Sequence, residues 1–359
     1  MNKQRIGIVG IGKISGIYLD NLTGMFSKRV TLISVTDVIA ERAEKAAVDY
    51  HVRHIKTPED LINDPEVDII LNITQPQNHH AVAMAAVKAG KHVYNEKPLC
   101  VTREEAAELL KAAAEKKVRV GGAPDTFLGA GIQTCRKLID DGWIGRPVAA
   151  SAFMMNHGHE HWHPDPAFYY KTGGGPMFDM GPYYLTALVN LLGPITRVSG
   201  SAKQGFTRRT ITSEPLNGTV IDVDVPTHIA GVLDFAGGAV GTIITSFDVW
   251  ASSMPFIEIY GSEGTLQVPD PNTFGGPVRV RRFREEAWSE IPLLKNFPDN
   301  SRGFGITDMA EAIVESRPHR ASGELAYHVL DVMHGIHDAS ASGAYYQVKS
   351  TCARPEPLG

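Results

Sequence analysis

Apolar residues in the N-terminal third of the chain follow two alternating patterns. Short runs rich in Val and Ile predict buried strands, and the longer segments between them, with apolar residues at helical spacing, predict helices. The predicted strands are Arg5–Val9, Val30–Val35, Val67–Ile73, Lys91–Tyr94 and Val118–Gly121. Strands that alternate with helices of about 10–15 residues are typical of a parallel, doubly wound α/β sheet.

The pattern changes near Ala123-Pro124, and we expect a domain boundary there, with domains at residues 1–123 and 124–359. A helix is predicted from Leu128 to Asp141, and short β-type runs then recur. They are Val148–Met155, Val198–Lys203, Thr227–Phe235, Ala239–Phe247 and Phe256–Tyr260. Turn residues at Gly237-Gly238 and 261–264 predict hairpins. Such a sheet packs one face on helices and leaves the other for a substrate or a second subunit.

Composition agrees with a two-domain globular protein, because 359 residues exceed what one hydrophobic core usually supports. The net charge of −5 indicates no nucleic-acid partner and no membrane partner. No apolar run approaches the roughly 20 residues that span a bilayer. The apolar segment after Met1–Arg5 is too short and too rich in glycine for a signal peptide. The three cysteines are scattered, which fits a reducing compartment, and we expect a cytoplasmic protein.

The first predicted strand runs into Gly10-Ile11-Gly12-Lys13-Ile14-Ser15-Gly16, followed by a predicted helix. This setting makes a G-x-G motif credible as a dinucleotide-binding loop. Gly10 permits a tight turn, Gly12 lets the backbone approach a pyrophosphate, and the helix amino-terminus supplies N–H groups and a positive dipole. Ser15 replaces the usual third glycine, and an ordinary strand–helix turn is the alternative.

Asp37 ends the second predicted strand, 21 residues after Gly16, where an acidic residue commonly binds the adenosine ribose. An aspartate there repels a 2′-phosphate and favours NAD, although Arg42 could accommodate NADP. Asp37 could also cap the helix predicted from Ala40 to Ala47.

A charged pair, Glu96 and Lys97, follows the fourth predicted strand. Ligands of open α/β sheets bind outside the carboxyl ends of the strands. A lysine at that place can be partly desolvated, which lowers its pKa and suits it to proton transfer. A surface Glu–Lys pair of little energetic consequence is the alternative.

Several motifs together resemble the Gfo/Idh/MocA oxidoreductase family, over essentially the whole chain. They are GIGKISG at 10–16, Asp37, NITQPQNH at 72–79, AGKHVYNEKP at 89–98, the glycines between Gly173 and Gly181, and IYGSEGTL at 259–266. The resemblance implies a Rossmann domain, an open and mainly antiparallel C-terminal sheet that often builds dimers or tetramers, and hydride transfer between a nicotinamide and a sugar or polyol carbon. It places Lys97 at the nicotinamide and His79 near the cofactor. The expected cofactor-binding residues are Gly10, Gly12, Lys13, Ile14, Asp37, Thr74, His79, Glu96 and Lys97.

Asp179 matches the aspartate that the family carries after its triple glycine, but Tyr183 stands where the family has a histidine. Tyrosine, with an ordinary pKa near 10, is a poor base unless a cation such as Lys97 lowers that value. Alternatively, Lys97 moves the proton itself. We favour Lys97 as the acid/base, with Asp179 orienting and Tyr183 as a partner of the lysine or a co-acid.

The stretch 156–165 contains four alternating histidines, which as a strand could place their imidazoles on one side and bind zinc. A sugar-binding loop is favoured instead, with no metal, because His157, Trp162 and His163 offer a stacking surface and hydrogen-bond donors. Substrate contacts are therefore expected from these three residues together with Lys97, Asp179 and Tyr183.

The sequence favours an NAD(P)-dependent dehydrogenase or reductase of a sugar, glycoside or polyol. An NAD-dependent glycosidase that oxidises its substrate transiently would use the same features. A non-catalytic nucleotide sensor is the third hypothesis, and retention of Lys97 and Asp179 argues against it.

Overall fold

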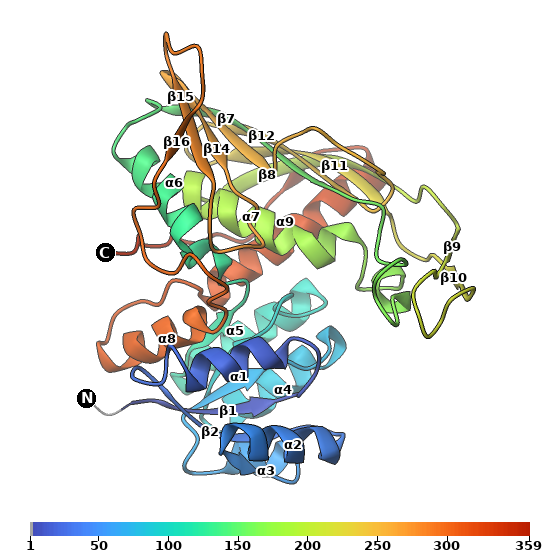
Figure 1. Ribbon diagram of the computed structural model, residues 1–359, viewed down its shortest axis with the longest axis vertical. Helices are drawn as coiled ribbons and strands as arrows, with labels where there is room; N and C mark the ends of the chain where they lie inside the picture. Colours follow the sequence, from blue (N-terminus) through green and yellow to red (C-terminus); the bar gives the residue numbers. More distant parts are fainter. Residues whose placement is uncertain (1–2) are drawn as a thin grey trace. The chain divides into compact units, whose positions relative to one another are not determined.

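The computed structural model describes residues 3–359 (Figure 1). Met1 and Asn2, which open the segment compared above with a signal peptide, lie outside the described residues. Contacts divide the chain into two compact units. One comprises the described residues up to Leu128 together with Asn300–Leu330, and the other comprises Gly129–Asp299 and Asp331–Gly359.

The first unit contains a six-stranded sheet in the order β3-β2-β1-β4-β5-β6, with parallel pairing throughout the described ladders. This confirms the predicted Rossmann sheet. Its strands are β1 (Arg5–Val9), β2 (Thr31–Thr36), β3 (Arg53–His54), β4 (Ile69–Asn72), β5 (His92–Asn95) and β6 (Val120–Gly122). Its helices are α1 (Ser15–Thr23), α2 (Ala40–Tyr50), α3 (Pro58–Asn63), α4 (Pro76–Lys88), α5 (Arg103–Lys116) and α8 (Phe304–Val314), with a 3-10 turn η1 (Thr126–Leu128).

A late segment of the chain, Asn300–Leu330, joins this first unit, whereas the sequence analysis places all of 124–359 in the second domain. Helix α8 packs against β6. Asp125 accepts the backbone N–H groups of Gly303 and Gly305, each at 2.9 Å, at the start of that helix. The apolar pattern of residues 304–314 predicts a buried helix but does not say which sheet it covers, so the sequence could not assign it.

Strand register brings the loops that follow four strands to one edge of the sheet. Val9 pairs with Thr36 on one side and Asn72 on the other, and Asn72 pairs with Asn95. Because these residues end their parallel strands, the residues that come next emerge in one row. This row is the carboxyl edge, where open α/β sheets bind ligands.

The second unit is built on a nine-stranded sheet in the order β16-β15-β14-β13-β7-β12-β11-β8-β17. β12 pairs in parallel with β7, and the other described pairs are antiparallel, which confirms the mainly antiparallel prediction. The strands are β7 (Pro147–Met155), β8 (Ile195–Lys203), β11 (His228–Phe235), β12 (Val240–Ser246), β13 (Ile257–Gly261), β14 (Gly264–Val268), β15 (Val278–Arg282), β16 (Ser289–Ile291) and β17 (Tyr346–Gln347). A separate two-stranded sheet holds β9 (Arg208–Thr210) and β10 (Val220–Asp222).

Helices cover one face of the nine-stranded sheet. Helix α6 (Ala130–Asp140) packs on β14 and β15, and α7 (Pro176–Leu192) packs on β7, β11 and β12. Burial alternates along β11, where Ile229 and Leu233 are fully buried, so this strand turns its apolar side to the helices. The remaining elements are η2 (Ala167–Tyr170) and α9 (Gly323–Ser342). Within residues 3–359, no helix combines the length and the apolar character that a bilayer crossing requires.

Candidate functional site

The loop between β1 and α1 has the shape of a phosphate-binding turn. Gly10 has a φ of +100°, and a Cβ there would lie 3.0 Å from the backbone of Ile73 and Thr74, so only glycine fits. A Cβ at Gly12 would have no atom within 4 Å, which leaves the backbone open to approach. The exposed residues Lys13 and Ile14 follow, and α1 begins at Ser15. Its amino-terminal N–H groups and dipole suit an anion.

Asp37 fixes this glycine loop. One carboxylate oxygen accepts the N–H of Ile11 at 2.5 Å, and the other accepts the N–H of Ile39 at 2.7 Å. The residue that caps α2 is Ile39, so the structure rejects the expectation that Asp37 is the N-cap. The side chain nevertheless lies directly after β2, on the edge where the ribose site is expected.

His79, expected near the cofactor, is fully buried in α4. Its Nδ1 lies 2.6 Å from the carbonyl oxygen of Pro98, and its Nε2 lies 3.0 Å from that of Thr74. Burial lowers the pKa of this imidazole, against the raising effect of the two carbonyl groups. The ring therefore holds the loop after β4 against the loop after β5. Both ring nitrogens face these backbone carbonyl groups.

Glu96 anchors the loop that carries Lys97. Its carboxylate accepts the hydroxyl of Tyr18 and the backbone N–H of Lys97, both at 2.7 Å. Glu96 is 9% exposed, and Lys97 is half-buried just beyond the end of β5. A buried carboxylate that accepts two hydrogen bonds fixes the backbone at the lysine, so the lysine has a defined place on the carboxyl edge.

Asp179 and Tyr183 lie one turn apart on α7 in the second unit, as their spacing predicts. Pro176 opens this helix, and Gly175, with a φ of +85°, precedes it. Asp179 lies in the first turn, where the positive end of the helix dipole favours a carboxylate. Tyr183 is 7% exposed.

His159, which no sequence motif singles out from the other histidines of its loop, donates its Nε2–H to Asp179 at 3.1 Å. The imidazole is enclosed by aromatic rings: Tyr169 at 3.9 Å, Phe247 at 4.7 Å and Trp162 at 5.3 Å between centroids. Its Nδ1 is buried and has no hydrogen-bond partner. The alternating pattern of histidines suggested metal binding or contacts with a sugar. It gave no sign that His159 bonds Asp179, which lies 20 residues further along the chain.

A buried charge network fixes the loop around His159. Glu160 accepts Nη1–H of Arg209 at 3.0 Å and the hydroxyl of Tyr170 at 2.6 Å. Arg209 also bonds Asp248 and the carbonyl of Phe247. Arg209 is 6% exposed, so its charge is balanced by two carboxylates in the interior. Loop 156–170 is thereby tied to β9.

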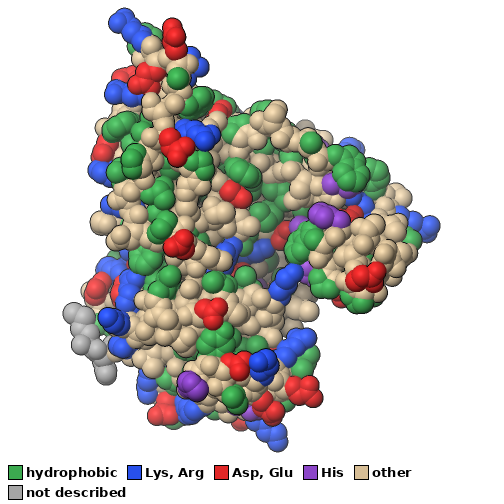
Figure 2. Space-filling model, viewed as in Figure 1, with side chains coloured by type: hydrophobic (Ala, Val, Ile, Leu, Met, Phe, Trp, Pro, Cys, Tyr) green, Lys and Arg blue, Asp and Glu red, His purple; other side chains and the backbone are tan. Residues whose placement is uncertain are grey.

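The other predicted sugar-binding residues lie on the same loop, which is not a strand. The His157 ring stacks on Trp250 at 3.4 Å, and burial, helped by Arg209, lowers its pKa. Trp162 is 48% exposed, and His163 accepts the N–H of Asp165 at 3.0 Å. Figure 2 shows histidine and hydrophobic side chains together on the surface beside the region that Figure 1 labels β9 and β10. Within residues 3–359, no three His, Cys, Asp or Glu side chains are grouped as metal ligands.

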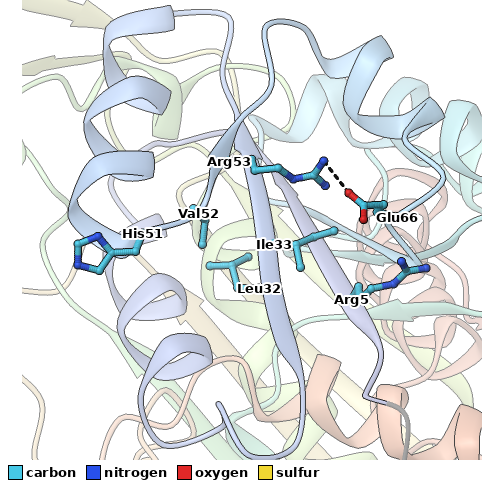
Figure 3. A pocket seen from close by; sticks show the side chains of 7 residues that line it. All are labelled: Arg5, Leu32, Ile33, His51, Val52, Arg53 and Glu66. Carbon is cyan, nitrogen blue, oxygen red and sulfur yellow. Dashed lines mark ion pairs between the residues drawn. The ribbon is translucent and has the colours of Figure 1, made fainter.

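A hollow of about 500 Å³ lies at the opposite, amino edge of the first sheet (Figure 3). It is lined by Arg5, Leu32, Ile33, His51, Val52, Arg53 and Glu66. Arg53 bridges Glu66 across it at 2.9 Å. Because parallel sheets bind nucleotides at their carboxyl edge, this hollow is not the predicted cofactor site.

Comparison with protein families gives two matches in order along the chain. The model of the oxidoreductase family with an NAD-binding Rossmann fold, GFO_IDH_MocA, matches residues 4–122. A GFO/IDH/MocA C-terminal domain matches residues 132–267. The chain belongs to the GFO/IDH/MocA oxidoreductase family. Membership confirms the resemblance drawn from the motifs, the NAD-binding domain and the assignment as an NAD-dependent oxidoreductase.

Named relatives and solved structures agree with this family. A 1,5-anhydro-D-fructose reductase of Ensifer adhaerens is 27% identical over 89% of this chain and 91% of its own. A myo-inositol 2-dehydrogenase of Thermotoga maritima is 26% identical over 73% of this chain and 74% of its own. Levoglucosan dehydrogenase in complex with NADH shares the fold with a TM-score of 0.81 at 20% identity, over 97% of this chain and all of its own.

Proposed function

We propose that this oxidoreductase is an NAD-dependent dehydrogenase or reductase that acts on a hydroxyl-bearing carbon of a sugar, glycoside or polyol. One observation supports it above the others: Glu96 fixes Lys97 on the same sheet edge as the glycine loop and Asp37. The names of the relatives, which concern anhydrofructose, inositol and levoglucosan, support a polyhydroxylated substrate.

The glycine loop and the start of α1 in the first unit fit a dinucleotide. Gly10 fills a position that no side chain could occupy, Gly12 leaves the backbone open, and the start of α1 follows at once. Gly10, Gly12, Lys13 and Ile14 would hold the pyrophosphate, Asp37 would bind the adenosine ribose, and Thr74 and Glu96 would flank the nicotinamide side. The nicotinamide, when bound, accepts or supplies the hydride. His79 contributes by holding two of these loops together.

Lys97 is the acid/base in this proposal. In oxidation the lysine amine takes the proton of the substrate hydroxyl, and in reduction the ammonium gives a proton to the carbonyl oxygen, which becomes the hydroxyl. The second unit supplies substrate contacts: Asp179 accepts a hydrogen bond from a substrate hydroxyl, and Tyr183 donates or accepts another. His157, Trp162 and His163 recognise the ring. Trp250, which stacks on His157, belongs with them.

The test is a panel of substrates with NAD and NADP, followed by absorbance of the reduced nicotinamide. The panel contains 1,5-anhydro-D-fructose with reduced cofactor, and levoglucosan, inositols, hexoses and aryl glycosides with oxidised cofactor. Turnover of at least one, with preference for NAD, is expected. Release of the aglycone from an aryl glycoside without net NADH would instead indicate transient oxidation.

The role of Lys97 is tested by Lys97→Met, which retains the length of the side chain and removes the amine. A loss of about 10²- to 10⁴-fold in kcat is expected, the usual contribution of general acid–base catalysis. The Kd for NADH should stay within a few-fold. Lys13→Met, on the exposed loop assigned to the pyrophosphate, is the control for loss of a positive charge near the cofactor, and it should raise the Kd for NADH but leave kcat at saturating cofactor within a few-fold. An unchanged kcat in Lys97→Met would remove the lysine from the mechanism.

We also propose that the protein forms a homodimer or homotetramer through the sheet face away from α6 and α7. Residues at alternate positions of β7, β11 and β12 on that face are mostly small or uncharged, such as Ala149, Val232 and Thr242. Such a face is suited to burial against a second copy. Light scattering after size-exclusion chromatography tests this, and Val232→Lys should shift an oligomer towards monomer.

A further inference from the structure

The contact between His159 and Asp179 lies wholly within the second unit and connects two elements far apart in sequence. Its Nε2–H···Oδ2 distance is 3.1 Å, and both side chains are largely buried, at 9% and 12% exposure. A carboxylate that accepts a bond from imidazole has its plane and direction fixed. The bond therefore determines the direction in which the Asp179 carboxylate points.

The surroundings hold His159 in this one position. Gly158, with a φ of +83°, precedes it, and a Cβ there would lie 2.1 Å from the Tyr170 hydroxyl, so no other residue fits. Glu160 follows it and is bonded to Arg209 and Tyr170. The aromatic rings around the imidazole prevent it from turning away. His159 is constrained by both neighbouring residues and by its ring contacts, so its imidazole keeps one orientation, toward Asp179.

We propose that His159 is a positioning residue that orients the Asp179 carboxylate toward a hydroxyl of the substrate. The Nδ1 atom is buried and Nε2 is bonded to Asp179, so neither ring nitrogen is left to bond the substrate. It acts through Asp179, in the way that buried partners orient ligating and catalytic groups. The inference rests on the proposed function, since it assigns Asp179 to a polyhydroxylated substrate.

The first experiment compares His159→Phe, which retains an aromatic ring, with His159→Gln, whose Nε2–H group can still donate to Asp179. In His159→Phe, kcat/KM for the best substrate should fall about 10- to 100-fold, the usual effect of a lost hydrogen bond to a charged group. His159→Gln should recover most of this loss. Equal losses in both variants, or no loss in His159→Phe, would overturn the proposal.

A double-mutant cycle separates positioning from a general effect on the loop. Because His159 acts through Asp179, adding His159→Phe to Asp179→Ala should change kcat/KM little further. If the two residues acted independently, the fold-losses in kcat/KM of the two single variants would multiply. Lys171→Met removes an exposed ion pair with Asp224 just after the same loop and is the structural control. It should stay within a few-fold of wild type. A multiplicative double variant, or a Lys171→Met loss as large as that of His159→Phe, contradicts the inference.

Imidazole ¹⁵N NMR of the substrate-free protein decides the contact independently of turnover. The His159 signal, assigned by its absence in His159→Gln, should show the Nε2–H tautomer and change in Asp179→Ala. An Nδ1–H tautomer in the wild type overturns the inference. A panel without turnover refutes the proposed function and leaves this NMR result to decide the contact.

Discussion

The carboxylate of Asp37 lies 2.5 Å from the backbone nitrogen of Ile11, so the end of β2 is tied to the loop that follows β1. The sequence assigns Asp37 to the ribose of the cofactor or to the cap of a helix, and the structure adds a bond to the glycine loop. Cofactor preference and loop geometry thus depend on one carboxylate. Substitutions at this position change both at once.

Asp37→Ala should weaken NADH binding about tenfold or more, because a charge-assisted hydrogen bond to the loop disappears along with the ribose contact. If the loop contact matters, NADPH binding should not improve beyond the wild-type value, even though the repulsion of its 2′-phosphate is gone. Fluorescence titration of both nucleotides measures this. Glu66→Gln, at the amino edge of the sheet, is the control (Figure 3). Tighter NADPH binding in Asp37→Ala would show that the carboxylate acts only against the phosphate.

Buried and exposed arginines alternate on β9, which permits a matched test of the charge network. The side chain of Arg209 is 5% exposed and faces Glu160 and Asp248, whereas that of Arg208 is 74% exposed and faces Asp222. Arg209→Met leaves two carboxylates buried without their cation, and should lower the free energy of unfolding by about 3–5 kcal/mol. Arg208→Met should lower it by less than about 1 kcal/mol. Urea denaturation followed by circular dichroism compares them. Similar small losses would mean that the network contributes little.

The strand-end residues of the first unit could be predicted from sequence because a parallel sheet imposes a regular order. Once β1, β2, β4 and β5 are recognised, the residues after each must lie on one edge. The neighbours of Asp179 follow no such rule. His159 and Glu160 lie in an irregular loop, and the partner of Glu160, Arg209, is 49 residues away. The local sequence Gly158-His159-Glu160, within an aromatic stretch, is a weak signal that many loops share.

For His79 and the segment 300–330 too, the sequence predicts the local structure but not the tertiary contacts. Residue type and motif position suggested that His79 lies near the cofactor, but its two ring nitrogens face backbone carbonyls, which only the packed loops reveal. The helix at 304–314 is visible as an apolar segment, yet its place against β6 depends on Asp125. Hydrophobic periodicity predicts helices and strands. It does not predict which side chains from distant parts of the chain will contact one another.

Trp162 offers an aromatic surface beside the Asp179–His159 pair, at 48% exposure, and is expected to bind the substrate ring. Trp162→Ala should raise KM about tenfold with little change in kcat, because a stacking contact of about 1–1.5 kcal/mol acts on bound substrate and transition state alike. Trp288→Ala, a half-exposed tryptophan just before β16, should leave KM unchanged. Initial rates over a range of substrate concentrations give both constants. A fall in kcat at constant KM would place Trp162 with the reacting groups instead.

We expect the stability of the first unit to depend on pH through Asp125. Burial, reinforced by the charge of Glu96, raises the pKa of this carboxyl to about 6, although the N–H groups of Gly303 and Gly305 oppose the change. Between the ordinary value of an unfolded aspartate and about 6, the folded protein holds a proton that the unfolded chain has lost. Its contribution to stability is therefore complete at low pH and disappears as pH rises through about 6.

The asparagine variant removes this titration while retaining an oxygen for the two backbone N–H groups. From pH 5 to pH 7.5, the wild type should lose about 1.4 kcal/mol of unfolding free energy relative to Asp125→Asn. Urea denaturation of both proteins at the two pH values measures the difference. Glu44→Gln, an exposed substitution on α2, should show no such change relative to wild type. If the wild type instead gains stability over this range relative to Asp125→Asn, the carboxyl is held ionised in the folded protein and its pKa is lowered rather than raised.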